Sequence, residues 1–309
     1  MINWKLASST WDKQEYLALL EQIASDQFSL SNKVQKLEIE FAKWNGSRHS
    51  IMVNSGSSAN LLMVASLFYT ENSRLRLKPG DEVIVPAVSW STTYYPLHQY
   101  GLKMVFVDVD EGTLNLDVNA VKNAITKKTR AIFAVNLLGN PCDYASLNEI
   151  CDEHEIILLE DNCESVGCRY DERFGGTIGV MGSHSSYFSH HFSTMEGGYI
   201  TTDDEELYHI ILSLRSHGWT RNLPKQNRVT GNKSDNYFDE TFKFVLPGYN
   251  VRPLELSAAV GLKQLPKLQS FIDVRRANAL HFQKEFACFD SIHLQKEVGS
   301  NSSFGFSMI

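Results

Sequence analysis

The segment that spans residues 183–198 (SHSSYFSHHFSTMEGG) gathers side chains that can move protons. It holds two adjacent histidines, His190 and His191, together with a Ser-Thr pair and a Gly-Gly step. An imidazole has an unperturbed pKa of about 6.5, so it can take up and return a proton near neutral pH. For either residue, a buried structural histidine is the alternative. Adjacent side chains point in different directions and make a poor chelate, so we expect no metal site here.

A second segment, residues 54–61 (NSGSSANL), follows a predicted strand and opens a predicted helix. Small residues at such a point let backbone N–H groups approach a phosphate, and the helix dipole favours the anion. Gly56 and Ser57 are the candidate phosphate ligands. The alternative is an ordinary helix N-cap, for which Ser and Asn are common.

A third segment, residues 156–162 (IILLEDN), places Glu160 and Asp161 at the carboxyl end of a predicted strand. A buried aspartate at this point could hold the protonated ring nitrogen of a cofactor, because an opposite charge stabilises the protonated form. A solvated turn is the alternative for the same residues.

Elements that could position these groups follow from the apolar pattern. Short apolar runs predict strands at residues 50–53, 82–85, 103–107, 131–135 and 156–159, with helices such as 57–69 and 145–154 between them. This β–α alternation predicts a mostly parallel sheet covered by helices, whose ligands bind at the carboxyl ends of the strands. The first 45 residues and residues 254–287 are expected to be helical, residues 216–249 form a long polar loop, and residues 304–309 resemble a strand.

Composition limits the class of protein. The chain has 309 residues, 43% of them hydrophobic, and a formal net charge of −7, which disfavours nucleic acid or an anionic membrane as the main partner. No apolar run approaches the roughly 20 residues that span a bilayer. Five cysteines without regular spacing are typical of a reducing compartment. We therefore expect a cytoplasmic enzyme that binds neither nucleic acid nor membrane.

In this order and at these separations, the three segments resemble the pyridoxal-phosphate sugar aminotransferases that act on nucleotide-linked keto-sugars, the DegT/DnrJ/EryC1/StrS type. The resemblance covers nearly the whole chain. It implies an α/β, aspartate aminotransferase-like fold (fold type I), whose large domain has a mostly parallel mixed sheet flanked by helices. The large domain would cover residues 1–250, and residues 251–309 would begin a small C-terminal domain that is incomplete, because relatives continue further.

Ordinary members of this family carry a lysine eight residues before the second glycine of the Glu-Gly-Gly step. Here that position is His190, and no lysine occurs in residues 129–224. The resemblance places such a histidine in the 3-dehydratase branch, which removes the C3 hydroxyl of a nucleotide-linked 4-keto-6-deoxyhexose. It favours a GDP-linked, mannose-derived sugar of the colitose type.

The same resemblance implies how the cofactor is used. A lysine amine would bind pyridoxal phosphate covalently, whereas histidine leaves the pyridoxamine phosphate form free to react with the sugar. His190 would take a proton from the C4′ carbon of the cofactor and protonate the departing hydroxyl. L-glutamate would restore pyridoxamine phosphate by transamination, again with His190 as the proton carrier.

The cofactor-binding residues follow from the resemblance position by position. Trp90 would stack on the pyridine ring, with a core tryptophan as the alternative. Asp161 would pair with the pyridinium nitrogen, and Glu164 would lie near the ring hydroxyl. The phosphate would be bound by Gly56, Ser57 and Ser185.

A further set of residues is expected to face the substrate or a second subunit. Asn250, in GYNVRP, matches an asparagine that reaches the phosphate of the neighbouring subunit, which implies a homodimer. His217 and Arg221, in RSHGWTR, would contact the sugar or the nucleotide phosphate. A solvated loop is the alternative for these two residues.

Three other functions remain to be weighed. A plain sugar aminotransferase needs a lysine at position 190, and a cofactor-free homologue of the fold has no need of Asp161, Ser185 and Trp90 together. A related branch adds an iron–sulfur cluster and a reductase, and cluster binding requires cysteines close together. No cysteine lies between Cys168 and Cys288, so we expect no iron–sulfur partner.

Overall fold

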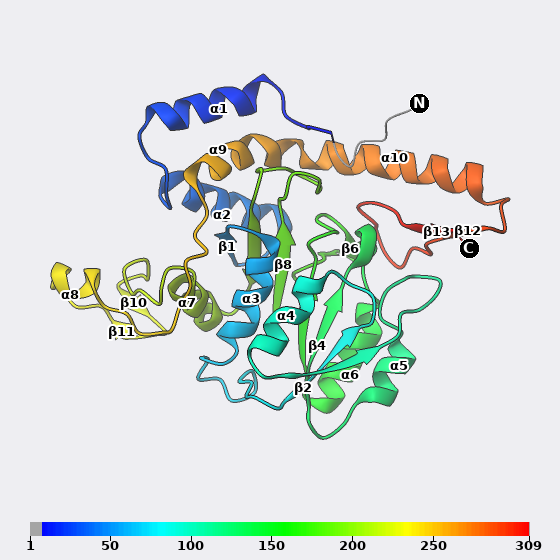
Figure 1. Cartoon of the computed structure of the whole chain (residues 1–309), viewed down its shortest axis with the longest axis horizontal. Coiled ribbons are helices and arrows are strands. Elements are labelled where there is room, and N and C mark those ends of the chain that lie inside the picture. The colour runs from blue at the N-terminus through cyan, green and yellow to red at the C-terminus, as the bar shows by residue number, and fades with distance from the viewer. Residues whose placement is uncertain (1–7, 309) are drawn as a thin grey trace.

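The computed structural model describes residues 8–308 and is built around a seven-stranded sheet with the order β1-β9-β8-β5-β4-β2-β3 (Figure 1). Strand β9 runs antiparallel to its neighbours β1 and β8, and the remaining neighbouring pairs are parallel. The carboxyl ends of the other six strands therefore share one edge of the sheet. The strands are β1 (His49–Val53), β2 (Glu82–Pro86), β3 (Lys103–Val107), β4 (Thr129–Val135), β5 (Ile157–Asp161), β8 (Met181–Ser185) and β9 (Gly198–Thr202).

Helices cover both faces of this sheet. One face packs against α3 (Gly56–Ser66), α4 (Ser91–Gln99) and α7 (Glu205–Leu214), and the other against α5 (Val118–Ala124) and α6 (Tyr144–His154). The alternation of side chains along a strand explains how one segment serves both layers. In β2, Val83 and Val85 enter the first core cluster and Ile84 enters the second.

A third layer lies over the β1–β9 end of the sheet. It contains α2 (Asn32–Asn45), α9 (Glu255–Gln264) and the start of α10 (Leu268–Phe286), with α1 (Lys13–Ala24) packed on α9 (Figure 1). Phe41 of α2 stacks on Phe192 and Tyr199, with ring centroids 5.8 and 4.5 Å away. This packing joins the N-terminal helices to the loop that carries the two histidines.

Short elements complete the described chain. The segment with β10, β11 and α8 projects from the body of the molecule (Figure 1). None of the helices within residues 8–308 is both long enough and apolar enough to cross a membrane. The short elements are β6 (Arg169–Tyr170), β7 (Arg173–Phe174), β10 (Gln226–Asn227), β11 (Gly231–Asn232), α8 (Tyr237–Thr241), β12 (Ile292–Leu294), β13 (Phe306–Met308) and the 3-10 turns Leu137–Gly139 and Leu265–Lys267.

The predicted α/β architecture is confirmed, with local differences. The helix expected at residues 57–69 ends at Ser66, and the helix expected at 254–287 is interrupted by a 3-10 turn that contains Pro266, which cannot donate a backbone hydrogen bond. The loop at 216–249 contains β10, β11 and α8. The terminal strand is present at 306–308, and residue 309 lies outside the described residues. The domain boundary at residue 250 stays a prediction.

Candidate active site

The three predicted segments and the loop that carries Trp90 meet at the carboxyl edge of the sheet, because β1, β2, β5 and β8 all end there. A Cβ placed on Gly56 would lie 2.7 Å from the Cys163 Sγ and 2.9 Å from the Ser185 Cβ. The Asn60 amide nitrogen lies 2.7 Å from a carboxylate oxygen of Asp161. Loops that are more than 100 residues apart in the sequence therefore form one site.

The first turn of α3 has the features of a phosphate site. Ser55 is the N-cap, since its side chain accepts a hydrogen bond from Ser58 N at 3.1 Å. The N-cap alternative is therefore correct for Ser55, but it leaves Gly56 and Ser57 as the first helical residues, whose N–H groups have no intrahelical acceptor. Ser185 Oγ, across from Gly56, accepts from Tyr187 N at 3.2 Å. An anion at this turn would be bound by backbone amides and hydroxyls.

Asp161 is a buried carboxylate, with 5% of its surface exposed, so the alternative of a solvated turn is wrong. Its Oδ2 accepts hydrogen bonds from Asn60 Nδ2 at 2.7 Å and Thr93 Oγ1 at 2.8 Å. Its Oδ1 accepts from Cys163 N at 3.1 Å. Among residues 8–308, no lysine, arginine or histidine nitrogen lies within 4.0 Å of it. A buried negative charge held only by neutral donors suits a cationic ring nitrogen.

The neighbouring Glu160 has a different task. Its fully buried carboxylate accepts from the backbone N–H groups of Gly176, Ile178 and Gly179, each at 2.6 Å. Burial raises the pKa of Glu160 above its ordinary value. Glu160 thus fixes the loop that precedes β8, and only Asp161 of the two predicted carboxylates faces the site.

Trp90 and Glu164 belong to the loops that follow β2 and β5. Trp90 is the N-cap of α4 and is 69% exposed, so the alternative of a core tryptophan is wrong. Glu164 Oε2 accepts from Leu138 N at 3.4 Å. Burial raises the pKa of the Glu164 carboxyl, and the charge of Asp161 raises it further. The residues present therefore fit pyridoxal or pyridoxamine phosphate, because they offer a phosphate turn, a ring-nitrogen partner and an exposed aromatic side chain three residues before Thr93, which binds Asp161.

His190 lies in a tight turn after β8. Its backbone N–H donates to Tyr187 O at 2.9 Å, and the Arg275 guanidinium donates to its carbonyl at 3.3 Å. Burial lowers the pKa of His190, the nearby charge of Arg275 lowers it further, and Asp161 opposes both effects. At neutral pH the imidazole is therefore a free base, able to accept a proton.

The second histidine of the pair is structural. His191 is buried, and its Nε2 lies 3.2 Å from the carbonyl of Ser302, so this nitrogen must carry the proton. Burial lowers the pKa of His191 to about 3. Within the described part of the chain, no group of three or more His, Cys, Asp or Glu side chains could hold a metal ion.

Among residues 8–308, no side-chain hydrogen bond or ion pair joins the three residues predicted to face the substrate or a second subunit to Asp161 or His190, but Asn54 N of the phosphate segment donates to Val251 O, next to Asn250, at 3.0 Å. Asn250 is exposed, and its Oδ1 accepts from Arg252 Nε at 3.0 Å. The ring of His217 packs edge-on against Trp219, with centroids 5.4 Å apart. The guanidinium carbon of the exposed Arg221 lies 5.8 Å from the centroid of the Trp219 ring. Arg221 also lines a cavity of about 450 Å³ beside α2 and α7. The roles of all three stay predictions.

The residues that support Asp161 are not among the predicted site residues. Asn60 belongs to the quoted phosphate segment, one helical turn after Gly56, and this spacing was a usable signal. Ser183 opens the predicted segment 183–198, whereas Thr93 and Arg275 approach the site only because the chain folds, and the sequence carries no local signal for these two.

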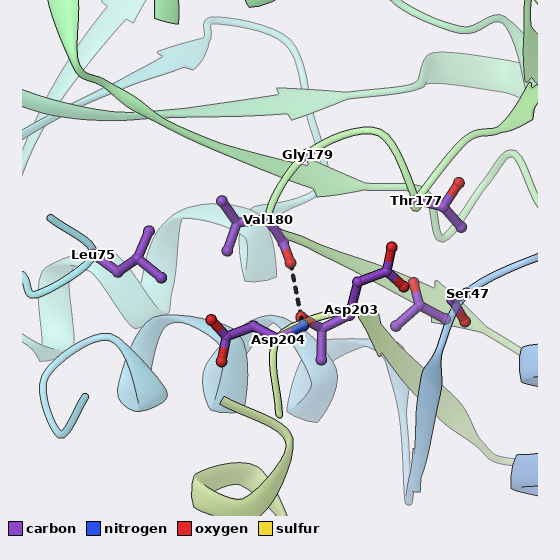
Figure 2. Close-up of a pocket in the computed structure, with 9 residues that line it drawn as sticks. Ser47, Leu75, Thr177, Gly179, Val180, Asp203 and Asp204 are labelled. Carbon is purple, nitrogen blue, oxygen red and sulfur yellow. Dashed lines mark hydrogen bonds between the residues drawn. The ribbon is translucent and has the colours of Figure 1, made fainter. Parts of the chain in front are cut away.

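A separate cavity lies at the opposite edge of the sheet (Figure 2). Its lining includes the end of β9 and the residue before β8, where Thr202 Oγ1 donates to Val180 O at 2.9 Å. Because β9 is antiparallel to its neighbours, this is the amino-terminal edge of the other strands. The cavity contributes nothing to the candidate site.

Comparisons with known proteins agree with this geometry. Residues 10–309 match the model of the DegT/DnrJ/EryC1/StrS aminotransferase family. The chain is 57% identical over 309 residues to GDP-4-keto-6-deoxy-D-mannose 3-dehydratase of Escherichia coli O55:H7. The matched region covers 100% of this chain and 79% of that protein. The protein of the same name from Yersinia pseudotuberculosis is also 57% identical, over 100% of this chain and 78% of its own length. A crystal structure of GDP-4-keto-6-deoxymannose-3-dehydratase with a trapped PLP-glutamate geminal diamine superposes with a TM-score of 0.97 at 57% identity, covering 99% of this chain and 79% of that one.

Proposed function

Because the chain belongs to the DegT/DnrJ/EryC1/StrS aminotransferase family, we infer that it is a pyridoxamine-phosphate-dependent 3-dehydratase of GDP-4-keto-6-deoxymannose. The observation that carries this conclusion is the residue type at position 190, a histidine in the turn after β8 at the carboxyl edge of the sheet, where ordinary members of the family have a lysine. A histidine can move protons at this position but cannot bind the aldehyde form of the cofactor covalently.

The cofactor is pyridoxal phosphate or pyridoxamine phosphate, and it supplies an electron-withdrawing ring and an amine that reacts with the C4 keto group of the sugar. Gly56 and Ser57 would bind its phosphate through the first turn of α3, with Ser185 opposite. Asp161 would hold the ring nitrogen in its protonated form, and Glu164 would lie near the ring hydroxyl. Trp90, which is exposed, would cover one face of the ring.

His190 is the catalytic residue of this proposal. As a free base, the imidazole would accept a proton from the C4′ carbon and become a cation. It would then give this proton to the hydroxyl that leaves C3, which would return the imidazole to its neutral form. Arg275, on the carbonyl side of His190, disfavours a permanent positive charge on the ring, so the proton is held only transiently.

L-glutamate is the amino donor that restores the pyridoxamine form, and His190 moves the proton in that reaction as well. Ammonia and a 3-deoxy-4-keto sugar are the remaining products. We place the reaction in the biosynthesis of a colitose-type deoxysugar of lipopolysaccharide O-antigen, in the cytoplasm, and expect no iron–sulfur reductase.

A homodimer completes the proposed site. Asn250 is exposed and would reach the cofactor phosphate of the partner subunit. The projecting segment around α8 supports this, because it carries large exposed aromatic side chains, a composition typical of a protein interface. These aromatic residues are Tyr237, Phe238, Phe242 and Phe244, which are 79%, 69%, 60% and 53% exposed. His217 and Arg221 would contact the sugar or the nucleotide phosphate.

Substrate turnover tests the proposal. The protein is incubated with pyridoxal phosphate, L-glutamate and either the GDP-, CDP- or dTDP-linked 4-keto-6-deoxyhexose. We expect 2-oxoglutarate, ammonia and a 3-deoxy-4-keto sugar in equal amounts with the GDP-sugar. A 4-amino sugar without free ammonia would instead identify an aminotransferase, and so would a pyridoxyl-lysine peptide after borohydride reduction.

A further inference from the structure

Two buried polar residues, Asn60 and Thr93, converge on one oxygen of Asp161. We propose that they are positioning residues, which hold the Asp161 carboxylate in place and thereby keep the ring nitrogen of the bound cofactor protonated. This inference deepens the proposed function, since it rests on a cofactor ring at Asp161. In this proposal, Asn60 and Thr93 act only through Asp161 and contact neither the substrate nor the reacting atoms.

Asn60 makes the shorter of the two contacts. Its amide nitrogen donates to Asp161 Oδ2 at 2.7 Å, while its Oδ1 is buried and has no hydrogen-bond partner among the described residues. An unpartnered buried oxygen is unfavourable for folding, so stability alone does not account for this residue. The reversed amide would place Oδ1 against the carboxylate, and the negative charge of Asp161 therefore sets the orientation of the group.

Thr93 supplies a second donor with a defined direction. Its hydroxyl lies 2.8 Å from Asp161 Oδ2 and 2.9 Å from Ser89 Oγ. A hydroxyl has one proton, and the carboxylate can only accept. The Thr93 proton therefore goes to Asp161, and Ser89 donates to Thr93. The result is a relay of donors from Ser89 through Thr93 to the carboxylate.

The neutrality of these donors matters for the cofactor. An arginine or lysine in their place would neutralise Asp161 and weaken its attraction for a cationic ring. Amide and hydroxyl groups fix the carboxylate and leave its charge for the ligand. Ser57 Oγ also donates to Thr92 Oγ1 at 2.9 Å, so the phosphate turn of α3 is linked to α4, the helix that carries Thr93.

The experiment compares the isosteric change Thr93→Val, which removes the donor, with Thr93→Ser, which keeps it. Asn60→Ala removes the second donor, and Asn115→Ala is the matched control. Asn115 is also buried and donates two hydrogen bonds, at 3.1 and 3.0 Å, but to the carbonyls of Asn140 and Pro141. The readouts are the affinity for pyridoxamine phosphate, the pH at which the absorbance of the bound ring titrates, and thermal unfolding.

We expect Thr93→Val and Asn60→Ala each to weaken pyridoxamine phosphate binding by about 10-fold, the usual effect of one hydrogen bond to a charged group. Both should also lower the pH at which the bound ring loses its proton. Thr93→Ser should behave like the wild type, and Asn115→Ala should lower only the unfolding temperature. In an Asp161→Asn background, Thr93→Val should have no additional effect on either cofactor readout.

Wild-type affinity and an unchanged ring titration in both Thr93→Val and Asn60→Ala would overturn this inference and leave the proposed function intact. An additive loss in the Asp161→Asn background would also overturn it, because the donors would then act independently of the carboxylate. If the wild-type protein itself failed to bind pyridoxamine phosphate, the proposed function and this inference would both be wrong.

Discussion

Replacement of Gly56 by alanine adds a single methyl group at the most crowded point of the proposed phosphate turn. The new Cβ would lie 2.7 Å from the Cys163 Sγ and 2.9 Å from the Ser185 Cβ, whereas ordinary contacts begin at 3.4 Å. The turn or its neighbours must therefore move by several tenths of an ångström. Overpacking of this kind typically costs about 1–3 kcal/mol.

If the phosphate turn is the part that moves, this free energy is lost from cofactor binding. Each 1.4 kcal/mol corresponds to a factor of ten, so we expect Gly56→Ala to raise the Kd for pyridoxamine phosphate roughly 5- to 150-fold. Titration of the apoprotein, followed by cofactor absorbance or tryptophan fluorescence, measures this directly. Circular dichroism at the same temperature checks that the variant is folded.

A second substitution identifies the contact that is responsible. Cys163→Ala removes the Sγ that the new methyl group would meet first, so it should restore part of the affinity in the Gly56→Ala background. By itself, Cys163→Ala should bind the cofactor nearly as well as the wild type. A folded Gly56→Ala protein with a Kd within twofold of the wild type would refute this reasoning, because the turn would then have room for a side chain.

Further predictions concern charge. Because burial and Arg275 lower the pKa of His190, the acidic limb of the dehydration rate should lie below pH 6.5, activity being lost as the pH falls through that pKa. Arg275→Met removes one cause of the shift, so a pH–rate profile should show this limb at higher pH, and an unmoved limb would contradict the assignment. Glu38→Ala leaves the buried Arg215 guanidinium without its carboxylate partner, and the free energy of unfolding in urea should fall by about 3–5 kcal/mol. Loss of the exposed Lys225–Asp235 pair should leave the free energy of unfolding unchanged. An equal fall in this free energy for the two pairs would contradict the prediction.

The sequence predicted the fold best where a strand is apolar along its whole length. The runs at 131–135 and 156–159 are apolar throughout, which is typical of strands covered on both faces, and they form the centre of the sheet. Asp161 was predicted on the same basis, because ligands of such sheets bind at the carboxyl ends of the strands, and Asp161 is the last residue of β5.

Strands β8 and β9 were not predicted, because many of their residues are polar although both strands are buried. β8 reads MGSHS and β9 reads GYITT, yet both are completely buried between β1 and β5. Their polar groups are paired inside the protein, for example His184 Nε2 with Thr201 Oγ1 at 3.0 Å. Hydrophobic periodicity cannot detect a strand of this kind, since partners that are distant in the sequence satisfy its side chains.

The support of Asp161 was beyond sequence analysis for a similar reason. Asn60, Thr93 and Ser183 come from three different elements, and each is an unremarkable polar residue in its own segment. Their common target becomes visible only when α3, α4 and β8 are packed around the end of β5. The difference between His190 and His191 also depends on the fold, because it arises from burial and from the carbonyl of Ser302.

The central claim, that the His190 imidazole carries the proton, is tested most directly by single-turnover dehydration of GDP-4-keto-6-deoxymannose with His190→Asn loaded with pyridoxamine phosphate. Removal of a general acid–base group should slow sugar consumption roughly 10²- to 10⁴-fold, while cofactor affinity stays close to that of the wild type. Dehydration at the wild-type rate by the loaded Asn variant would show that another group moves the proton.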